Sequence, residues 1–371
     1  MSGGGGLTHF KCSLNYNRVV ARRSDYDYTE CHTVENKRTY FITGVAGFLG
    51  SHLAESLLKD GHRVIGCDNL VGGYLDNVPV GVEFHMADCL DRAKMADIIR
   101  GVDVVYHTAA YAYEGFSVFS PHLVTQSIYG ATVSVVSAAI ANKVKRFVQC
   151  SSMARYGTQP TVPFTEDMEC KPQDPYGIAK YAAELTVRNL CEIHNMEYVI
   201  AVPHNIIGPR QKYDDPFRTV ASIMTNLMLQ GRQPIIYGDG EQMRCFSFVD
   251  DVVAPLKRMS TDAVPVGEVI NIGPDDQYIT INKLAVIIAK LIDFKLAPIY
   301  MSGRPQEVKY ATCSADKARR LLDYKTTVSL EEGLTSLIEY IRTRGVKPFL
   351  YHLDLEIVSD KTPRTWRDRL F

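Results

Sequence analysis

Residues 42–53 read ITGVAGFLGSHL, and this stretch decides the fold. It contains three glycines: Gly44, Gly47 and Gly50. An apolar run, TYFIT (39–43), precedes it, and an amphipathic stretch, HLAESLLKDG (52–61), overlaps its end and closes with a glycine. The first glycine permits a sharp turn, the second lets a ligand approach the backbone, and the third lets a helix pack closely on a strand. The stretch therefore predicts a strand, a tight turn and a helix.

Beyond this turn, short apolar runs continue to alternate with helical patterns. Further strands are expected over 62–68, 82–86, 102–107, 145–151 and 197–203, and long helices over 122–142 and 176–194. Buried strands that alternate with helices are typical of a parallel, doubly wound α/β sheet. After Asn205 the pattern loosens into short elements and Gly/Pro turns, which indicates a smaller α/β lobe.

We expect four parts along the chain. They are an N-terminal extension (1–38), a Rossmann domain (39–205) to which the chain returns near 243–275, a smaller lobe (206–242 and 276–350) and a C-terminal tail (351–371). In the tail, HLDLEIV (352–358) alternates apolar and charged residues, as a half-buried strand does. We expect this strand to dock at an edge of the body, with contact to a second subunit as the alternative. It leads to Trp366, the only tryptophan.

Composition excludes several classes of partner. The chain has 371 residues, 46% of them hydrophobic, and 41 basic against 42 acidic residues, so we expect neither a nucleic-acid nor a membrane partner. No run approaches 18 uninterrupted apolar residues, so no membrane span is expected. The nine cysteines form no CxxC pair, which favours reduced thiols in a cytoplasmic protein without a metal site.

An acidic residue at the end of the second expected strand indicates a dinucleotide site at the glycine turn. Asp68 follows Gly50 by 18 residues, and a carboxylate there can hold both ribose hydroxyls of an adenosine while repelling a 2′-phosphate. Free N–H groups at the start of the next helix favour a pyrophosphate. Asp88, after the third strand, is placed to meet the adenine. The sequence therefore predicts a site for NAD rather than NADP.

A second set of residues indicates the chemistry. Tyr176 and Lys180 are four residues apart on one helix face, and Ser152 follows the fifth expected strand. A phenol with an ordinary pKa of about 10 needs roughly 4 kcal/mol to become a base near pH 7. An ammonium group about 6 Å away supplies roughly 3 kcal/mol at an effective dielectric constant near 20. We expect Lys180, helped by a cationic nicotinamide, to lower the pKa of Tyr176, while Ser152 orients the substrate hydroxyl.

Together these motifs resemble those of extended short-chain dehydrogenase/reductases, within the NAD-dependent nucleotide-sugar epimerase/dehydratase family, and their pattern is closest to UDP-glucose 4-epimerases. The resemblance runs from about residue 39 to 345. Its motifs are TGxxGFxG at 43–50, SSxxxYG at 151–157, YxxxK at 176–180, the Asn before GP at Asn205, and IYGDGxQxR at 236–244.

The resemblance implies which residues bind NAD and a UDP-sugar. For NAD the expected residues are Gly44, Gly47, Phe48, Leu49, Gly50, Asp68, Asn69, Asp88, Cys89, Thr108, Ala109, Ala110, Ser127, Tyr176 and Lys180. It implies that Arg244 and Arg304 clamp the diphosphate, which suits the bidentate geometry of guanidinium groups. It also implies that Asn205 contacts the sugar-phosphate, that Tyr237 lies against the nucleotide base, and that Ser152 contacts the sugar.

The loop CSSMARYG (150–157) bears on the reaction. In the 4,6-dehydratases of this family an Asp-Glu pair follows the catalytic hydroxyl residue, whereas this chain has Met153 and Ala154. Without that acid and base, water loss has no proton path. We therefore expect an NAD-dependent nucleotide-sugar 4-epimerase that oxidises C4 of a UDP-hexose and then reduces it from the other face. The alternatives are an oxidoreductase of the same fold, acting on a nucleotide-sugar or keto-sugar, and a non-enzymatic NAD-sensing protein.

Departures from the family pattern bear on the sugar. Ala311 replaces a bulky Tyr that limits room at C2, so we hypothesise that the site admits a C2 N-acetyl group, as in a UDP-N-acetylhexosamine. Arg155 replaces a common Val, and we interpret it as half of a structural salt bridge; the alternative is contact with a substrate carboxylate, as in UDP-glucuronate 4-epimerases. The resemblance also implies a homodimer through a four-helix bundle built from 122–142 and 176–194 of each subunit.

Overall fold

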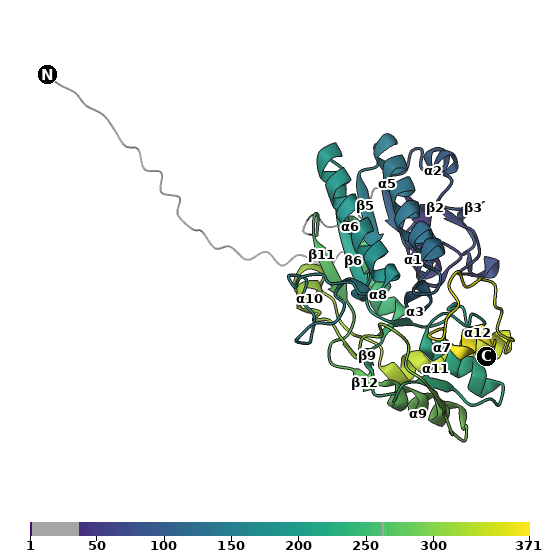
Figure 1. Ribbon diagram of the computed structural model, residues 1–371. Coiled ribbons are helices and arrows are strands. Elements are labelled where there is room, and N and C mark those ends of the chain that lie inside the picture. The colour runs from purple at the N-terminus through teal and green to yellow at the C-terminus, as the bar shows by residue number, and fades with distance from the viewer. Residues whose placement is uncertain (2–36, 262, 264) are drawn as a thin grey trace, which may run out of the picture. The chain divides into compact units, whose positions relative to one another are not determined.

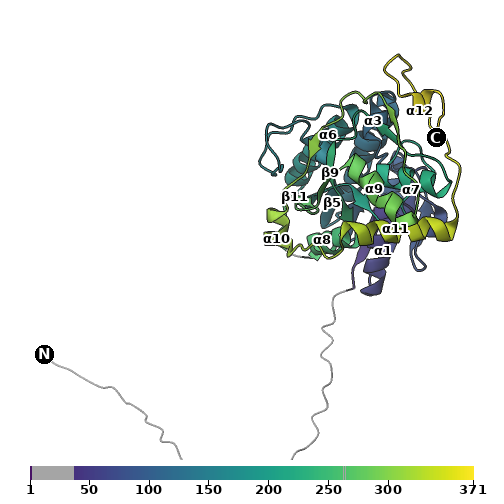
Figure 2. The same cartoon turned by 90° about the horizontal axis from the view of Figure 1, so that it is seen from below.

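Seven parallel strands form the central sheet of the computed structural model, which describes residue 1, residues 37–261, residue 263 and residues 265–371. In spatial order they are β11 (Val269–Ile272), β6 (Glu197–Pro203), β5 (Arg146–Cys150), β4 (Val104–His107), β1 (Thr39–Thr43), β2 (Arg63–Asp68) and β3 (Glu83–Met86). The sheet lies above the smaller lobe in Figure 1, and Figure 2 views the molecule from the side of that lobe. Most of the predicted extension over 1–38 lies outside the described residues.

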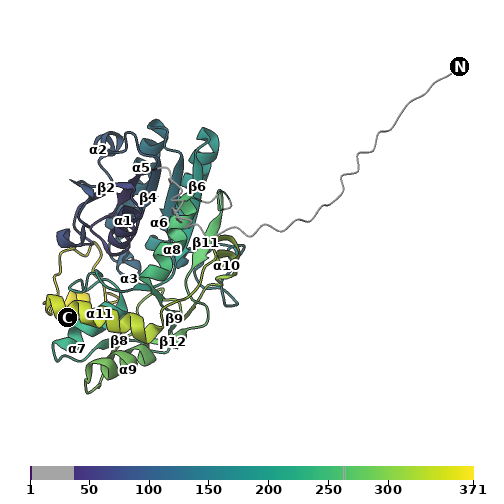
Figure 3. The same ribbon diagram turned by 180° about the vertical axis from the view of Figure 1, so that it is seen from behind.

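Helices cover both faces of the sheet, which confirms the predicted doubly wound architecture. One face carries α2 (Arg92–Ile98), α5 (Ala131–Ala141) and α6 (Pro175–His194). The other carries α1 (Phe48–Lys59), α8 (Val249–Thr261) and α10 (Asp316–Leu322). Figure 1 and Figure 3 view these two faces from opposite sides. The crossing point of the chain lies between β1 and β4, so the loops after these strands open onto one edge of the sheet.

The long helix predicted over 122–142 is interrupted. It consists of α4 (Pro121–Thr125), a π-helical turn (Gln126–Gly130) and α5. Such turns are often found at functional sites. The stretch Pro121–Ala141 is long and apolar enough to cross a membrane, but half of its apolar window is buried inside the protein. Val135, Val136 and Ala139 of α5 pack in the core of the sheet, so burial in the body accounts for its apolar character.

The smaller lobe is built around a separate apolar core. Its helices are α7 (Val220–Leu229), α9 (Ile281–Ile292) and α11 (Leu330–Arg344). Its short strands are β8 (Ile235–Tyr237), β9 (Met243–Cys245), β12 (Tyr278–Thr280), β13 (Ile299–Met301) and β14 (Tyr310–Ala311). The remaining short elements are the 3-10 turns Leu75–Asn77 and Met153–Arg155, α3 (Glu114–Ser117), the strand pair β7 (Ile206–Ile207) and β10 (Ser247–Phe248), and α12 (Arg364–Arg367).

The strand predicted over 352–358 is wrong, although the C-terminal tail (351–371) does dock on the body. The segment has no strand structure, and its backbone N–H at Ile357 donates to the carbonyl of Phe119 at 2.9 Å. Leu353 and Leu355 pack against an aromatic cluster, which explains their alternation without a strand partner. Glu356 accepts hydrogen bonds from two backbone N–H groups at the start of α4. The exposed side chain of Glu356 therefore ties the tail to the start of α4.

Candidate functional site

The first cavity, of about 310 Å³, opens where the strands of the central sheet end. Segments that follow β1, β2, β4, β5 and β6 all contribute to its wall. Every residue that was predicted to bind NAD lines this cavity: Gly44, Gly47, Phe48, Leu49, Gly50, Asp68, Asn69, Asp88, Cys89, Thr108, Ala109, Ala110, Ser127, Tyr176 and Lys180. The parallel sheet thus gathers residues that span more than a hundred positions of the chain.

The glycine turn forms a cradle that side chains would fill. Gly44 has a φ of +74°, and its carbonyl accepts a hydrogen bond from the N–H of Gly47 at 3.0 Å. A Cβ on Gly50 would lie 2.2 Å from the Gly44 carbonyl oxygen, so no larger residue fits there without moving the turn. The N-terminus of α1 faces the same cradle and has no side-chain cap. This arrangement suits a pyrophosphate.

Two carboxylates stand beside this cradle. Asp68 accepts hydrogen bonds from the N–H groups of Ala46 and Leu70, at 3.0 Å and 2.7 Å, and these bonds fix its carboxylate. Burial raises the pKa of Asp68, although the backbone donors oppose this shift. Asp88 accepts from the side chain of Asn69 at 2.8 Å. A fixed carboxylate at the end of β2 fits the ribose hydroxyls of a dinucleotide and disfavours a 2′-phosphate.

The three predicted catalytic residues come together at the floor of the first cavity. Ser152 caps the 3-10 turn after β5, and Tyr176 and Lys180 occupy the first turns of α6. The Lys180 ammonium lies 6.0 Å from the centre of the Tyr176 ring and donates to the Cys150 carbonyl at 2.9 Å. Asp174 caps α6 by accepting from the Gly177 N–H at 2.8 Å, which fixes the start of the helix.

Lys180, helped by a cationic nicotinamide, was predicted to lower the pKa of Tyr176. For the chain without NAD this prediction is wrong. Burial raises the pKa of Tyr176 well above its ordinary value, and the hydroxyl of Ser152 opposes this only in part. Burial also lowers the pKa of Lys180 to about 8. Desolvation of the phenolate is therefore the main influence of the folded chain on this tyrosine.

A second cavity, of about 240 Å³, adjoins the first. The two cavities share five lining residues: Ala112, Glu114, Asn205, Arg218 and Thr219. Of the predicted substrate residues, Asn205 lines both cavities, Ser152 lines the first, and Tyr237, Arg244 and Arg304 line the second. The cavities are therefore continuous, and Asn205, which was predicted to contact the sugar-phosphate, stands where they meet.

The two arginines that were predicted to clamp the diphosphate are held by neighbouring groups in the second cavity. Arg304 pairs with Glu307 at 2.7 Å and lies over the ring of Tyr237, 4.9 Å from its centre. Arg244 donates to backbone carbonyls, including that of Val308 at 2.7 Å, and lies 4.0 Å from Glu307. These contacts fix both guanidinium groups in one cavity, which suits the recognition of a diphosphate.

Two expectations about the sugar have different outcomes. Arg155 forms a buried ion pair with Glu184 at 2.9 Å, which confirms the interpretation of a structural salt bridge. Ala311 packs in an apolar core cluster with Tyr156 and Cys313 and lines neither of the two cavities. The hypothesis that a small residue at this position makes room at C2 of the sugar therefore stays a prediction.

Comparison with known proteins agrees with this geometry. The family model described as "NAD dependent epimerase/dehydratase family" matches residues 40–273. The chain belongs to this family. It is 32% identical over 315 residues to UDP-glucose 4-epimerase of Mycolicibacterium smegmatis, and the match covers 82% of this chain and 98% of that protein.

Solved structures of other epimerases share the fold. UDP-glucose 4-epimerase of Thermotoga maritima, solved with UDP-glucose, is 31% identical with a TM-score of 0.78, covering 82% of this chain and 99% of that one. UDP-glucuronic acid 4-epimerase of Bacillus cereus, solved with UDP-glucuronic acid and NAD, is 27% identical with a TM-score of 0.77, covering 83% of this chain and all of that one. NAD is the cofactor of this family, and the residues of the first cavity fit it.

Sequence reasoning missed several residues that line the cavities of this epimerase/dehydratase. Glu114 lines both, and its carboxylate is close enough to both arginines to affect their pKa values. Arg218 also lines both and donates to the Gly72 carbonyl at 2.8 Å. A carboxylate inside the otherwise apolar run that follows β4 was a signal for Glu114. The sequence carried no such signal for Trp366 and Phe371, which line the second cavity from the C-terminal tail.

Proposed function

We propose that this chain is an NAD-dependent UDP-sugar 4-epimerase. One observation supports this proposal above the others: Ser152, Tyr176 and Lys180 converge on a cavity that fits NAD and that continues into an arginine-bearing cavity. Net oxidation and epimerisation both use this triad. The continuous site favours epimerisation because the oxidised sugar can stay bound beside the cofactor until it is reduced again.

The reaction begins at the C4 hydroxyl of the sugar. NAD, when held in the first cavity, would supply a cationic hydride acceptor for the oxidation at C4 and the source of hydride for the reduction. Ser152 and Tyr176 hold the C4 hydroxyl, and the added positive charge offsets the burial that keeps the Tyr176 phenol protonated. Tyr176 then takes the hydroxyl proton as the C4 carbonyl forms and gives it back when the carbonyl is reduced. Lys180 holds positive charge beside the phenol.

Inversion requires that the sugar turns over while the nucleotide stays bound. Arg244 and Arg304 are placed to hold the diphosphate through this motion, and Asn205 stands where the two cavities meet. Asn205 has a φ of +23°, a strained value for a residue other than glycine, and its side chain donates to the Cys245 carbonyl at 2.9 Å. A strained residue held in place at this junction is consistent with a role in binding.

Water loss is disfavoured by the residues that follow Ser152. Met153 and Ala154 begin the 3-10 turn, and neither can act as an acid or a base. Glu114 is a carboxylate at the junction of the cavities, but the loop offers it no partner to complete an acid–base pair. The turn that follows Ser152 therefore lacks the acid–base pair that the dehydratases of this family carry there for elimination across C5 and C6.

UDP-glucuronate is a second candidate substrate, since basic side chains other than Arg155 are available to meet a carboxylate. Arg218 lines both cavities, and Lys212 lines the first, where its ammonium lies 3.4 Å from Asp214. The test is to incubate the purified chain with UDP-glucose, UDP-N-acetylglucosamine and UDP-glucuronate, without added NAD, and to follow the C4 epimers by NMR. Stoichiometric NADH without epimer would contradict the proposal and favour an oxidoreductase.

We also propose that the protein forms a homodimer and lies in the cytoplasm. On α6, Ile178 and Leu185 are seven residues apart, and about half of each side chain is exposed. Tyr129 of the π-helical turn is exposed next to α6 and accepts a hydrogen bond from Thr186. This apolar strip supports a four-helix bundle between two subunits, and the seven cysteines among the described residues are free thiols. Leu185→Lys should yield a monomer in light-scattering measurements if the strip is the interface.

A further inference from the structure

We propose that the C-terminal tail is part of the substrate site, and that Trp366 and Phe371 form the wall of the second cavity against which the base of a nucleoside diphosphate lies. The inference rests on the proposed function, since it concerns the nucleotide half of the same substrate. The tail lies outside the family model, which ends at residue 273, and outside the stretch of motif resemblance, which ends near residue 345.

The tail reaches the second cavity from the far end of the chain. Trp366 and Phe371 line it together with Tyr237 and Arg304, which come from the smaller lobe. A Cβ on Gly115 would lie 3.3 Å from the Arg304 guanidinium and 3.5 Å from the Trp366 ring, so α3, the arginine and the indole meet at one point. Thr365 is hydrogen-bonded to the hydroxyl of Tyr237. The tail therefore contacts the tyrosine that was predicted to lie against the base, and it lines the same cavity as the arginine that was predicted to hold the diphosphate.

Specific contacts hold the aromatic residues of the tail in place. The indole N–H of Trp366 donates to the Pro216 carbonyl at 3.1 Å. The hydroxyl of Tyr351 donates to the Thr365 carbonyl at 2.7 Å and accepts from the N–H of Phe371 at 3.0 Å. Only 4% of Trp366 is exposed, because it packs edge-on against Phe116, Phe119 and Phe217. A fixed aromatic wall is a suitable surface for a base, because bases stack on aromatic rings.

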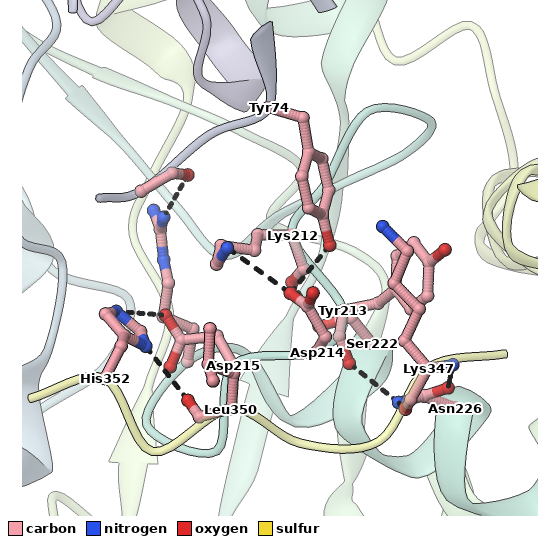
Figure 4. A network of polar contacts seen from close by, with 12 residues as sticks. Tyr74, Lys212, Tyr213, Asp214, Asp215, Ser222, Asn226, Lys347, Leu350 and His352 are labelled. Atoms are coloured by element: carbon pink, nitrogen blue, oxygen red, sulfur yellow. Dashed lines mark hydrogen bonds and ion pairs between the residues drawn. The ribbon is translucent and has the colours of Figure 1, made fainter. Parts of the chain in front are cut away.

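The start of the tail is anchored to a network of polar contacts (Figure 4). His352 lies 3.8 Å from Asp215, a fully buried carboxylate that also accepts from the hydroxyl of Tyr113 at 2.7 Å. The N–H of Leu350 donates to the Asp214 carbonyl at 2.8 Å. Tyr113 directly precedes Glu114, so the anchor of the tail and the junction of the cavities share one segment.

The tail also contacts the segment that supports the catalytic tyrosine. Ser117 accepts a hydrogen bond from the N–H of Tyr176 at 3.1 Å, and three residues later Ser120 donates to the Asp354 carbonyl at 2.9 Å. The segment 113–120 thus lies between the tail and the start of α6. Through this segment, a nucleotide base that contacts Trp366 would have a fixed position relative to the catalytic residues.

Because Trp366 is the only tryptophan of the chain, its fluorescence reports directly on the second cavity. UDP should change the emission of the intact chain along a curve that matches binding measured by calorimetry. NAD should leave the emission unchanged, since no residue of the tail lines the first cavity. Trp366→Ala should weaken UDP binding about tenfold, and Trp366→Phe should recover most of this loss, as expected for stacking. Val358→Ala, an exposed change in the same tail, is the matched control.

The two proposals fail in different ways. If UDP binds the intact chain by calorimetry while the Trp366 emission stays constant and Trp366→Ala binds UDP like the parent, the tail is not part of the site, and the proposed function stands. If calorimetry detects no UDP binding to the intact chain, the proposed function and the tail inference are both wrong. The measurements on the intact chain need no variant, so misfolding of Trp366→Ala would not prevent the decision.

Discussion

The first and second cavities meet at Glu114 and Asn205 but are assembled from different kinds of segment. The first is lined where neighbouring parallel strands end, so each strand contributes a short motif to the same edge of the sheet. The second is lined by parts of the chain that are far apart in sequence, from Gly115 to Phe371, the last residue. The cofactor side is thus fixed by the architecture of the sheet, whereas the substrate side depends on loops and a tail that can change independently.

The two cavities also differ in the partners that hold their charged side chains. In the first, Asp68 and Asp88 are fixed by neutral donors, and Lys180 is buried with a carbonyl as its partner. In the second, two arginines share one carboxylate, Glu307. An anionic diphosphate therefore finds positive charge in the second cavity that is only partly neutralised. The following predictions alter one cavity at a time.

The largest effect is expected from a substitution that removes the proposed base and leaves both cavities intact. Tyr176→Phe should lower kcat for epimerisation by about 10³-fold, because general acid–base groups contribute roughly 10²–10⁴-fold. NAD content and UDP affinity should stay within about twofold of the parent, since the phenyl ring keeps its packing. Epimer formation is followed by NMR, and NAD by absorbance. A loss below tenfold would falsify the assignment of Tyr176 as the base.

The second prediction concerns the buried ammonium of the first cavity. Burial lowers the pKa of Lys180 from 10.5 to about 8. Between these two values the unfolded chain binds more protons than the folded chain, so the free energy of unfolding should rise with pH. We expect the parent to gain about 2–3 kcal/mol relative to Lys180→Met between pH 8 and 10.5.

Chemical denaturation at several pH values measures this difference, because titrations that both proteins share cancel. Lys290→Met, at an exposed position of α9, provides the matched control and should show no comparable gain. Parallel pH curves for the parent and Lys180→Met would show that the ammonium is not destabilised by burial.

The third prediction tests the second cavity alone. Arg304→Lys should weaken UDP binding about tenfold, since lysine loses the bidentate geometry and the flat stacking on Tyr237. NAD binding should not change, because Arg304 does not line the first cavity. Arg342→Lys is a suitable control, as Arg342 forms a similar ion pair with Glu339, three residues away on an exposed face of α11. Calorimetry with UDP and with NAD measures both effects.

Sequence patterns located the first cavity well because its determinants are local. A glycine turn, an acid at the end of a strand and a Tyr–Lys pair on one helix face each lie within a few residues, and a parallel sheet brings such segments to one edge. The strand β1 (Thr39–Thr43) and the strand β6 (Glu197–Pro203) lie where the patterns predicted them. Arg155 was also interpreted correctly, since a buried arginine needs a partner.

The errors concern features that depend on distant parts of the chain. The alternation over 352–358 correctly indicated a half-buried segment, but only the tertiary structure shows that an aromatic cluster, and not a strand, covers it. The pKa of Tyr176 depends on burial, which spacing alone does not give. Glu114 and Trp366 became part of the site only through folding of the smaller lobe and the tail around α3.

The smallest expected effect lies at the junction of the cavities. Glu114 lowers the net positive charge that Arg244 and Arg304 present, and desolvation raises the pKa of its carboxyl. Glu114→Gln should therefore strengthen UDP binding by about threefold at low ionic strength, since removing one like charge near an anion is worth only a fraction of a kcal/mol to about 1 kcal/mol in a partly solvated site. Screening should shrink this gain as salt is added.

Glu339→Gln removes a carboxylate from an exposed face of α11 and should leave UDP binding unchanged at every salt concentration. The epimerase assay adds a second readout, because a charge that acts only on the diphosphate changes KM and not kcat. If Glu114→Gln instead lowers kcat by tenfold or more with UDP affinity unchanged, the carboxylate acts on the sugar and belongs functionally to the first cavity. Glu114 would then belong with the residues that hold the sugar, and the sugar would be held wholly by residues at the edge of the sheet.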